Sequence, residues 1–226
     1  MQSFSLVDSK GVPLDKKLDE LFQQKQNGFF IELGANDGLR QSNTAFFEFF
    51  RNWKGVLIEP AVSMYEKCKQ NRPKSMCYNY ACVSPSYTNE YIGGDFDGSL
   101  MGSVNGTRNG REVTTFAKAK TLEYILNESG HTGSIDLLSL DTEGYELPIL
   151  EGLNLQRFRP KYMIIEIYNK DYELIYNYLQ ENNYNIIGCI SNYNHIDCPN
   201  WDGTHNDYLF FDTLNTIRPT DISNQP

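Results

Sequence analysis

Short apolar runs alternate with amphipathic stretches along most of this chain of 226 residues. The runs at 29–33, 55–58 and 135–140 are predominantly apolar and too short for buried helices. Strands that are covered on both faces of a parallel sheet have this character. Because the stretches between them repeat apolar residues at helical spacing, the pattern predicts an α/β fold with right-handed crossover connections.

The same pattern places the individual elements. We expect strands at 29–33, 55–58, 75–83, 135–140, 162–167, 184–190 and 207–211, and helices at about 14–25, 42–50, 60–71, 121–127, 147–150 and 171–182. No helix separates the last two strands, which predicts a hairpin and an antiparallel last strand. We expect one domain over 1–226, with an N-terminal helical segment (1–27) and a tail (213–226). The glycine-rich segment 84–112 is predicted to be an irregular insertion or lid beside the acceptor.

The charge balance limits the partners. The chain has 29 Asp and Glu against 20 Lys and Arg, a net charge of −9. Proteins that bind nucleic acid present a basic surface to the phosphates. The local basic groups at 67–74 and 108–120 are expected to lie on solvated helix and loop faces. We therefore expect no nucleic-acid partner.

The sequence also predicts a location. No stretch approaches the roughly 18 apolar residues that a membrane span needs. The first 20 residues lack the basic and apolar regions of a signal peptide. The five cysteines are odd in number and form no C-x-x-C pair, as expected of reduced thiols. These features predict a cytoplasmic protein without a membrane span.

A glycine-bracketed loop follows the first strand, in the segment ELGANDG at 32–38. Its G-x-x-x-G spacing differs from the G-x-G-x-x-G that seats a dinucleotide pyrophosphate. Acidic residues in the loop would repel a pyrophosphate and suit a ligand with an ammonium and a sulfonium group. The loop therefore favours S-adenosylmethionine over NAD. The candidate cofactor-binding residues here are Glu32, Gly34, Ala35, Asn36, Asp37 and Gly38.

Acidic residues also follow two later strands. Glu59 ends the second strand, where a carboxylate can accept both hydroxyls of an adenosine ribose; alternatively it caps the helix that Pro60 opens. Asp141 and Glu143 follow the strand 135–140 and should border the reaction centre, although turn and N-cap roles are the alternative. The candidate cofactor-binding set is completed by Ser42, Glu59, Pro60, Ala81, Cys82, Asp141 and Glu143.

These segments together carry a family resemblance. ELGANDG, VLIEP, TLEYIL, IDLLSLDTEGYELPILEG and HNDYLFF occur in this order over about 28–212 and resemble the FkbM family of methyltransferases. The resemblance implies a Rossmann-like class I methyltransferase fold with a seven-stranded sheet, helices on both faces and S-adenosylmethionine as donor. It also implies methyl transfer to oxygen, with a hydroxyl of a sugar, glycan or small hydroxylated molecule as acceptor. The sequence departs from the commoner family pattern at Glu32, where Asp is frequent, and in segment 84–112.

A sugar hydroxyl is a weak nucleophile, so a general base would assist its methylation. Asp141 is the first candidate for that base, followed by His205 and Glu166. The spacing of His195, Cys198 and His205 matches no standard zinc pattern. A divalent cation held by Asp141 and Glu166 is an alternative, by analogy with metal-assisted O-methyltransferases. We assign no metal ligand from the sequence.

Other functions fit the same architecture. A nicotinamide-dependent oxidoreductase lacks support because the phosphate fingerprint is missing. A non-catalytic binding module is disfavoured by the intact Gly34, Glu59 and Asp141. Within the methyltransferase class, a protein or another small molecule is the alternative acceptor.

Overall fold

The predicted sheet is present in the computed structural model, which describes residues 2–96, 101–106, 108 and 110–215. Its seven strands run in the order β3-β2-β1-β7-β8-β10-β9. Their bounds are β1 Phe29–Leu33, β2 Lys54–Ile58, β3 Met76–Tyr78, β7 Ile135–Leu140, β8 Pro160–Tyr168, β9 Tyr184–Cys189 and β10 His205–Asp212. Only β10 is antiparallel to its neighbours, and it lies between β8 and β9. The mostly parallel sheet with an antiparallel last strand is confirmed.

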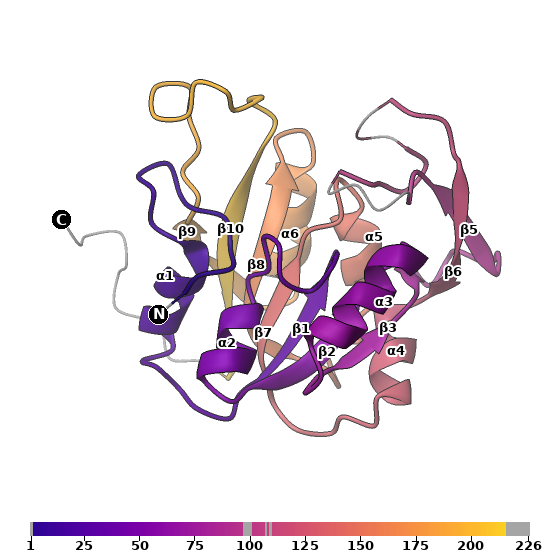
Figure 1. Cartoon of the computed structure of the whole chain (residues 1–226), viewed down its shortest axis with the longest axis horizontal. Helices are drawn as coiled ribbons and strands as arrows, with labels where there is room; N and C mark the ends of the chain where they lie inside the picture. Colours follow the sequence, from indigo (N-terminus) through magenta and orange to yellow (C-terminus); the bar gives the residue numbers. More distant parts are fainter. Residues whose placement is uncertain (1, 97–100, 107, 109, 216–226) are drawn as a thin grey trace.

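Helices cover both faces of this sheet (Figure 1). Their bounds are α1 Leu14–Leu21, α2 Ala45–Phe50, α3 Val62–Asn71, α4 Leu122–Glu128, α5 Glu146–Glu151 and α6 Tyr172–Glu181. Side chains of α1, α2 and α3 join one buried cluster, which includes Phe30 of β1. Side chains of α4, α5 and α6 join another, which includes Ile31 and Leu33. Successive residues of a strand face opposite sides, so β1 separates the two layers.

The predicted third strand, 75–83, is interrupted. After Tyr78 the side-chain amide of Asn79 donates hydrogen bonds to the backbone carbonyls of Glu59 and Pro60, at 2.9 and 3.0 Å. The chain then leaves the main sheet, and β4 (Ala81–Cys82) pairs with a different strand. The long strand was predicted from apolar content alone, which does not register this side-chain contact with the neighbouring turn.

A second, three-stranded sheet in the order β4-β6-β5 follows from that departure. It contains β5 (Tyr91–Gly94) and β6 (Thr115–Lys120), so the segment 84–112 is not wholly irregular as predicted. Gly94 belongs to β5, where a Cβ would come within 2.6 Å of the carbonyl oxygen of Ser103. Gly93 and Gly94, which contributed to the prediction of a loop, instead allow close packing around β5.

The strand order reverses direction between β1 and β7, which are neighbours in the sheet. The helix after β1 is α2 and the helix after β7 is α5, and these helices lie on opposite faces. A crevice opens at the carboxyl ends of strands where such a reversal occurs, and ligands of open α/β sheets bind there. The fold therefore directs attention to the residues that follow β1, β2 and β7.

Candidate cofactor and acceptor site

The loop after β1 touches the chain that leaves β7. Gly34 has a φ of +75°, and a Cβ placed on it would lie 1.8 Å from the carbonyl oxygen of Asp141. No residue with a side chain fits this approach. Gly38, with a φ of +82°, closes the loop against Cys68 and Arg72. The two glycines of the G-x-x-x-G spacing are therefore required by the backbone path.

Glu59 stands at the end of β2, where both oxygens of its carboxylate meet backbone donors. Its Oε2 accepts a hydrogen bond from the N–H of Asn36 and its Oε1 accepts one from the N–H of Ala61, both at 2.8 Å. An ionised carboxylate has about four acceptor sites, so each oxygen can still accept another hydrogen bond. The contact with Ala61, the N-cap residue of α3, shows that the capping role and a ligand-binding role are compatible.

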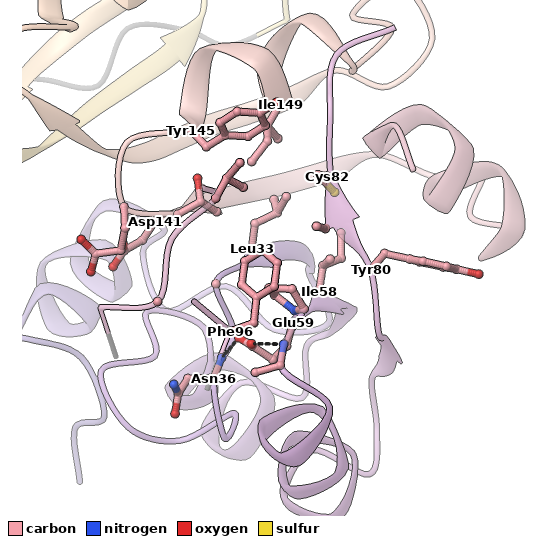
Figure 2. Close-up of a pocket in the computed structure, with 18 of the residues that line it drawn as sticks. Leu33, Asn36, Ile58, Glu59, Tyr80, Cys82, Phe96, Asp141, Tyr145 and Ile149 are labelled. Carbon is pink, nitrogen blue, oxygen red and sulfur yellow. Dashed lines mark hydrogen bonds between the residues drawn. The ribbon is translucent and has the colours of Figure 1, made fainter. Parts of the chain in front are cut away.

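A cavity of about 870 Å³ opens above these strand ends. Side chains from Leu33, Ile58, Phe96 and Ile149 contribute apolar surface to it, and Glu59 contributes a carboxylate. Figure 2 shows Asp141 and Tyr80 on opposite sides of this space. A cavity that combines apolar walls with several polar groups is suited to a ligand that has both an apolar body and hydrogen-bonding groups.

The structure brings most of the predicted cofactor-binding residues to this cavity. Its lining includes Gly34, Asn36, Ser42, Glu59, Pro60, Ala81, Cys82, Asp141 and Glu143. Ala35, Asp37 and Gly38 are not part of the lining. Asp37 instead accepts hydrogen bonds from the N–H groups of Leu39 and Arg40. These three residues shape the loop.

Several lining residues were not identified from the sequence. They include Leu33, Arg40, Gln41, Ile58, Ala61, Tyr80, Phe96, Gly102, Val104, Thr142, Tyr145 and Ile149. Leu33 and Ile58 are the last residues of β1 and β2, so their position at strand ends was a usable signal. Phe96 and Val104 belong to the segment 84–112, whose path depends on pairing that local periodicity does not reveal.

A buried guanidinium lies beneath the loop after β1 (residues 34–38), which we call the cofactor loop. Arg72 is fully buried, which corrects the expectation that the basic group 67–74 is solvated throughout. Its Nε donates to Glu48 Oε2 at 2.9 Å, and its Nη1 lies 3.4 Å from Glu32 Oε2. Nη1 also donates to the carbonyl of Gly38, and Nη2 to Thr44 Oγ1, both at 2.9 Å. One cation thus joins β1, the cofactor loop and α2.

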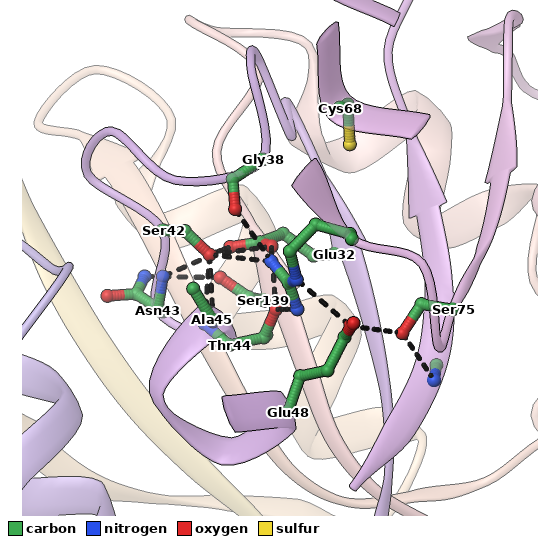
Figure 3. A network of polar contacts seen from close by, with 12 residues as sticks. Glu32, Gly38, Ser42, Asn43, Thr44, Ala45, Glu48, Cys68, Ser75 and Ser139 are labelled. Atoms are coloured by element: carbon green, nitrogen blue, oxygen red, sulfur yellow. Dashed lines mark hydrogen bonds and ion pairs between the residues drawn. The ribbon is translucent and has the colours of Figure 1, made fainter. Parts of the chain in front are cut away.

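Glu32 belongs to this network and not to the cavity (Figure 3). The hydroxyls of Ser42 and Thr44 donate to its carboxylate at 2.9 and 2.6 Å, and the N–H of Asn43 donates at 3.0 Å. Its direct contact with a cofactor was predicted because its negative charge in the segment ELGANDG suits an ammonium and a sulfonium group. The alternation of side chains along β1 places it on the opposite face from Leu33, which does line the cavity.

The three predicted catalytic residues lie in one neighbourhood. Asp141 borders the cavity, whereas Glu166 and His205 are not part of its lining. Glu166 Oε1 is 3.2 Å from Nε2 of His205. Burial and the negative charge of neighbouring carboxylates raise the pKa of both Asp141 and Glu166 well above the ordinary carboxyl range. Burial lowers the pKa of His205, which favours a neutral imidazole.

Glu143 is held from the far side of the same neighbourhood. The phenol of Tyr168 donates a 2.6 Å hydrogen bond to its Oε2, and Arg108 Nε donates to the same oxygen at 3.1 Å. Arg108 comes from the glycine-rich segment and also pairs with Asp202. The segment 84–112 is thereby tied to the turn after β7 and to the loop before β10.

The chain also has distant similarities to solved structures. The chain is similar to a TehB-like SAM-dependent methyltransferase from Corynebacterium glutamicum, with 7% identity, 88% of this chain and 86% of that chain covered, and a TM-score of 0.47. Fibrillarin from Aeropyrum pernix with bound S-adenosyl-L-methionine has 12% identity and a TM-score of 0.48, with 86% of this chain and 74% of that chain covered. The methyltransferase domain of METTL16 has 10% identity and a TM-score of 0.50, with 88% of this chain and 66% of that chain covered. The comparison with curated proteins gives no match.

The strand order, with one antiparallel strand near the edge, and the glycine loop beside the cavity are those of a class I methyltransferase fold. The family model of the FkbM methyltransferase domain matches residues 32–186. This match covers more than half of the chain, which therefore belongs to the FkbM methyltransferase family. Among the described residues, every helix is too short or too polar to cross a lipid bilayer.

Cofactor binding is expected to depend on pH through Glu59, because burial raises the pKa of this carboxyl to about 7. Ribose hydroxyls donate to the ionised form, so a ligand that uses them must displace a proton at lower pH. The affinity for S-adenosylhomocysteine should be constant above pH 8 and fall by up to about tenfold per pH unit below 7. Calorimetry between pH 5.5 and 8.5 measures this, with Glu59→Gln as the variant that should bind weakly at every pH. Equal wild-type affinity at pH 5.5 and 8.5 would contradict the role of Glu59.

Replacing Arg72 by Met should destabilise the protein by about 3–5 kcal/mol, because it leaves the carboxylates of Glu32 and Glu48 buried without their cation. Urea unfolding followed by circular dichroism measures the change. Lys67→Met is the matched control, since Lys67 is an exposed cation on the same helix α3. Its effect should stay within about 0.5 kcal/mol. Similar losses in the two variants would show that the burial of Arg72 carries no special stability.

Proposed function

We propose that this methyltransferase transfers the methyl group to an oxygen, on a hydroxyl of a sugar or glycan. The observation that carries the proposal is the position of Asp141. Asp141 lines the cofactor cavity, its carboxylate lies beside Glu166, and its backbone packs against the loop at Gly34. A proton acceptor is thus fixed relative to the donor site, as methylation of a neutral hydroxyl requires.

The cofactor fits the residues present. Glu59 offers unused acceptor sites for ribose hydroxyls, and Gly34 leaves room for close approach to the backbone. Bound S-adenosylmethionine would supply an electrophilic methyl group on its sulfonium. Asp141 would take the hydroxyl proton as the acceptor oxygen forms its bond to the methyl carbon and the bond to sulfur breaks. Because the reactants need mainly to be positioned, the described cavity walls at Phe96 and Val104 contribute by excluding water.

The surroundings of Asp141 support a neutral, hydroxylated acceptor. Tyr168 and His205 provide aromatic rings with polar edges beside Glu143 and Glu166. Such rings pack against apolar faces and bond to hydroxyls at the same time. The carboxylates and the net charge of −9 disfavour a polyanion such as nucleic acid. The described part of segment 84–112, tied down by Arg108, would cover the acceptor in this proposal.

Cofactor binding provides the first test. Wild-type protein should bind S-adenosylhomocysteine in calorimetry, and Gly34→Val should abolish binding because the new side chain would overlap the carbonyl of Asp141. Gly188→Ala is the matched control, since a Cβ there meets no atom within 4 Å. Circular dichroism verifies the folding of each variant. If Gly34→Val fails to fold, Glu59→Gln serves as the test, and full binding by a folded variant of either kind would contradict the assigned site.

Turnover provides the second test. Incubation with labelled donor and a panel of glycans, glycosylated lipids and hydroxylated metabolites should label a hydroxyl-bearing acceptor. Asp141→Asn should lower turnover by about 10²–10⁴-fold while it largely preserves S-adenosylhomocysteine binding. Glu181→Gln, an exposed carboxylate at the C-terminal end of α6 and so at the opposite edge of the sheet, should have wild-type turnover. Methyl transfer only to nitrogen, or undiminished turnover in Asp141→Asn, would overturn the proposed reaction.

A further inference from the structure

Three carboxylates converge where β7 and β8 end. Asp141 follows β7, Glu143 lies in the next turn, and Glu166 lies near the end of β8. One carboxylate oxygen of each lies within 4.8 Å of the other two. Two oxygens bonded to one Mg²⁺, Mn²⁺ or Ca²⁺ at 2.0–2.6 Å are at most about 4–5 Å apart. The three side chains can therefore reach a single ion.

The positive groups of the protein do not balance this charge. Arg108 pairs with Glu143, and Nε2 of His205 lies 3.2 Å from Glu166. Within the described ranges, no Lys or Arg side chain pairs with Asp141 or Glu166. Asp207, opposite Glu166 on β10 and only 6% exposed, adds a further acidic group. Like charges this close are costly in a buried site.

A second observation points to a missing partner. Glu166 is 7% exposed, and its Oε2 is buried without a hydrogen-bond donor, although Oε1 faces His205. Buried carboxylate oxygens are normally satisfied by protein, water or an ion. The orphaned oxygen belongs to the residue that lies deepest of the three. A cation between the carboxylates would satisfy it.

A shared proton is the competing explanation. One proton between Asp141 and Glu166 would reduce the repulsion of that pair. It would not account for the convergence of a third carboxylate, Glu143, whose side chain is oriented by Tyr168 and Arg108. Ligating side chains are commonly oriented by such outer partners. The convergence of all three favours an ion.

We propose that Asp141, Glu143 and Glu166 bind one divalent cation of the oxygen-preferring kind, Mg²⁺ or Mn²⁺. The donors are all carboxylates, which hard cations prefer. Three protein ligands leave about three positions of an octahedron for water or for an acceptor hydroxyl. Since Asp141 also borders the cofactor cavity, the ion would lie beside the reaction centre. This catalytic role rests on the proposed methylation of a hydroxyl, whereas binding of the ion does not.

The full chain, stripped with chelator and dialysed, is titrated with Mn²⁺ and followed by electron paramagnetic resonance. Wild-type protein should bind one Mn²⁺, and Mg²⁺ should displace it. Glu166→Gln should weaken Mn²⁺ binding by at least about tenfold. Glu173→Gln, an exposed carboxylate on α6, is the matched control and should bind as wild type. Absence of Mn²⁺ binding to folded wild-type protein, or equal binding by Glu166→Gln, overturns the site.

Thermal unfolding separates the cation from the shared proton. Without divalent ions, Glu166→Gln should melt at a higher temperature than wild type, because it removes a buried like charge. Added Mn²⁺ should raise the melting temperature of wild type and leave Glu166→Gln unchanged. A lower melting temperature for Glu166→Gln, with no Mn²⁺ effect on wild type, would favour the shared proton and overturn the proposal. S-adenosylhomocysteine binding in the same samples reports on the proposed function independently of the ion.

Discussion

The cofactor loop rests on the buried guanidinium of Arg72. This side chain bonds to the carboxylates of Glu32 and Glu48, and to a carbonyl and a hydroxyl of the segment that leaves β1. These four acceptors need donors that stay buried in one orientation. Arg72 meets that need because its planar fork offers five donors in a fixed arrangement. Ser42 connects this polar network to the cavity, because its hydroxyl bonds to Glu32 and the residue also lines the cavity.

A second constraint joins the donor site to the acceptor side. The approach of Gly34 to the carbonyl of Asp141 leaves no room for a side chain. A shift of the cofactor loop would therefore move the turn that carries Asp141 and Glu143. Rigid coupling of this kind matters in methyl transfer, because the reaction depends on the alignment of two bound molecules.

Much of this arrangement was predictable from local sequence. Apolar runs identified the seven strands of the main sheet. The residues that follow these strands include Gly34, Glu59 and Asp141, all of which line the cavity. Those inferences needed only the rule that ligands gather at the carboxyl ends of strands. The interruption at Asn79 and the strands β5 and β6 depend on contacts with distant segments, and they were missed for that reason.

The partners of charged residues were the least predictable feature. Glu32 was expected to face the cofactor and Arg72 to face water, yet they meet in the interior although they are 40 positions apart in sequence. The charge of a residue does not reveal its partner in the fold, because a charged side chain is equally compatible with an exposed position. The alternation of side chains along β1 would have placed Glu32 away from Leu33, but it does not reveal which element lies opposite.

The acidic residues in and beside the cavity differ in the hydrogen-bond donors that face them. This difference determines which ligands their carboxylates can bind. Glu59 receives one backbone N–H on each oxygen, so its charge is supported and its remaining acceptor sites suit neutral hydroxyls. Within the described chain, no backbone N–H faces the carboxylates of Asp141 or Glu166. Apart from His205, whose Nε2 lies 3.2 Å from Glu166, no cationic side chain of the described residues pairs with these carboxylates, so a proton or a bound cation would neutralise their charge. In the proposed site, the excess of carboxylates therefore provides a ribose-binding group at the end of β2 and a proton- or cation-binding group at the ends of β7 and β8.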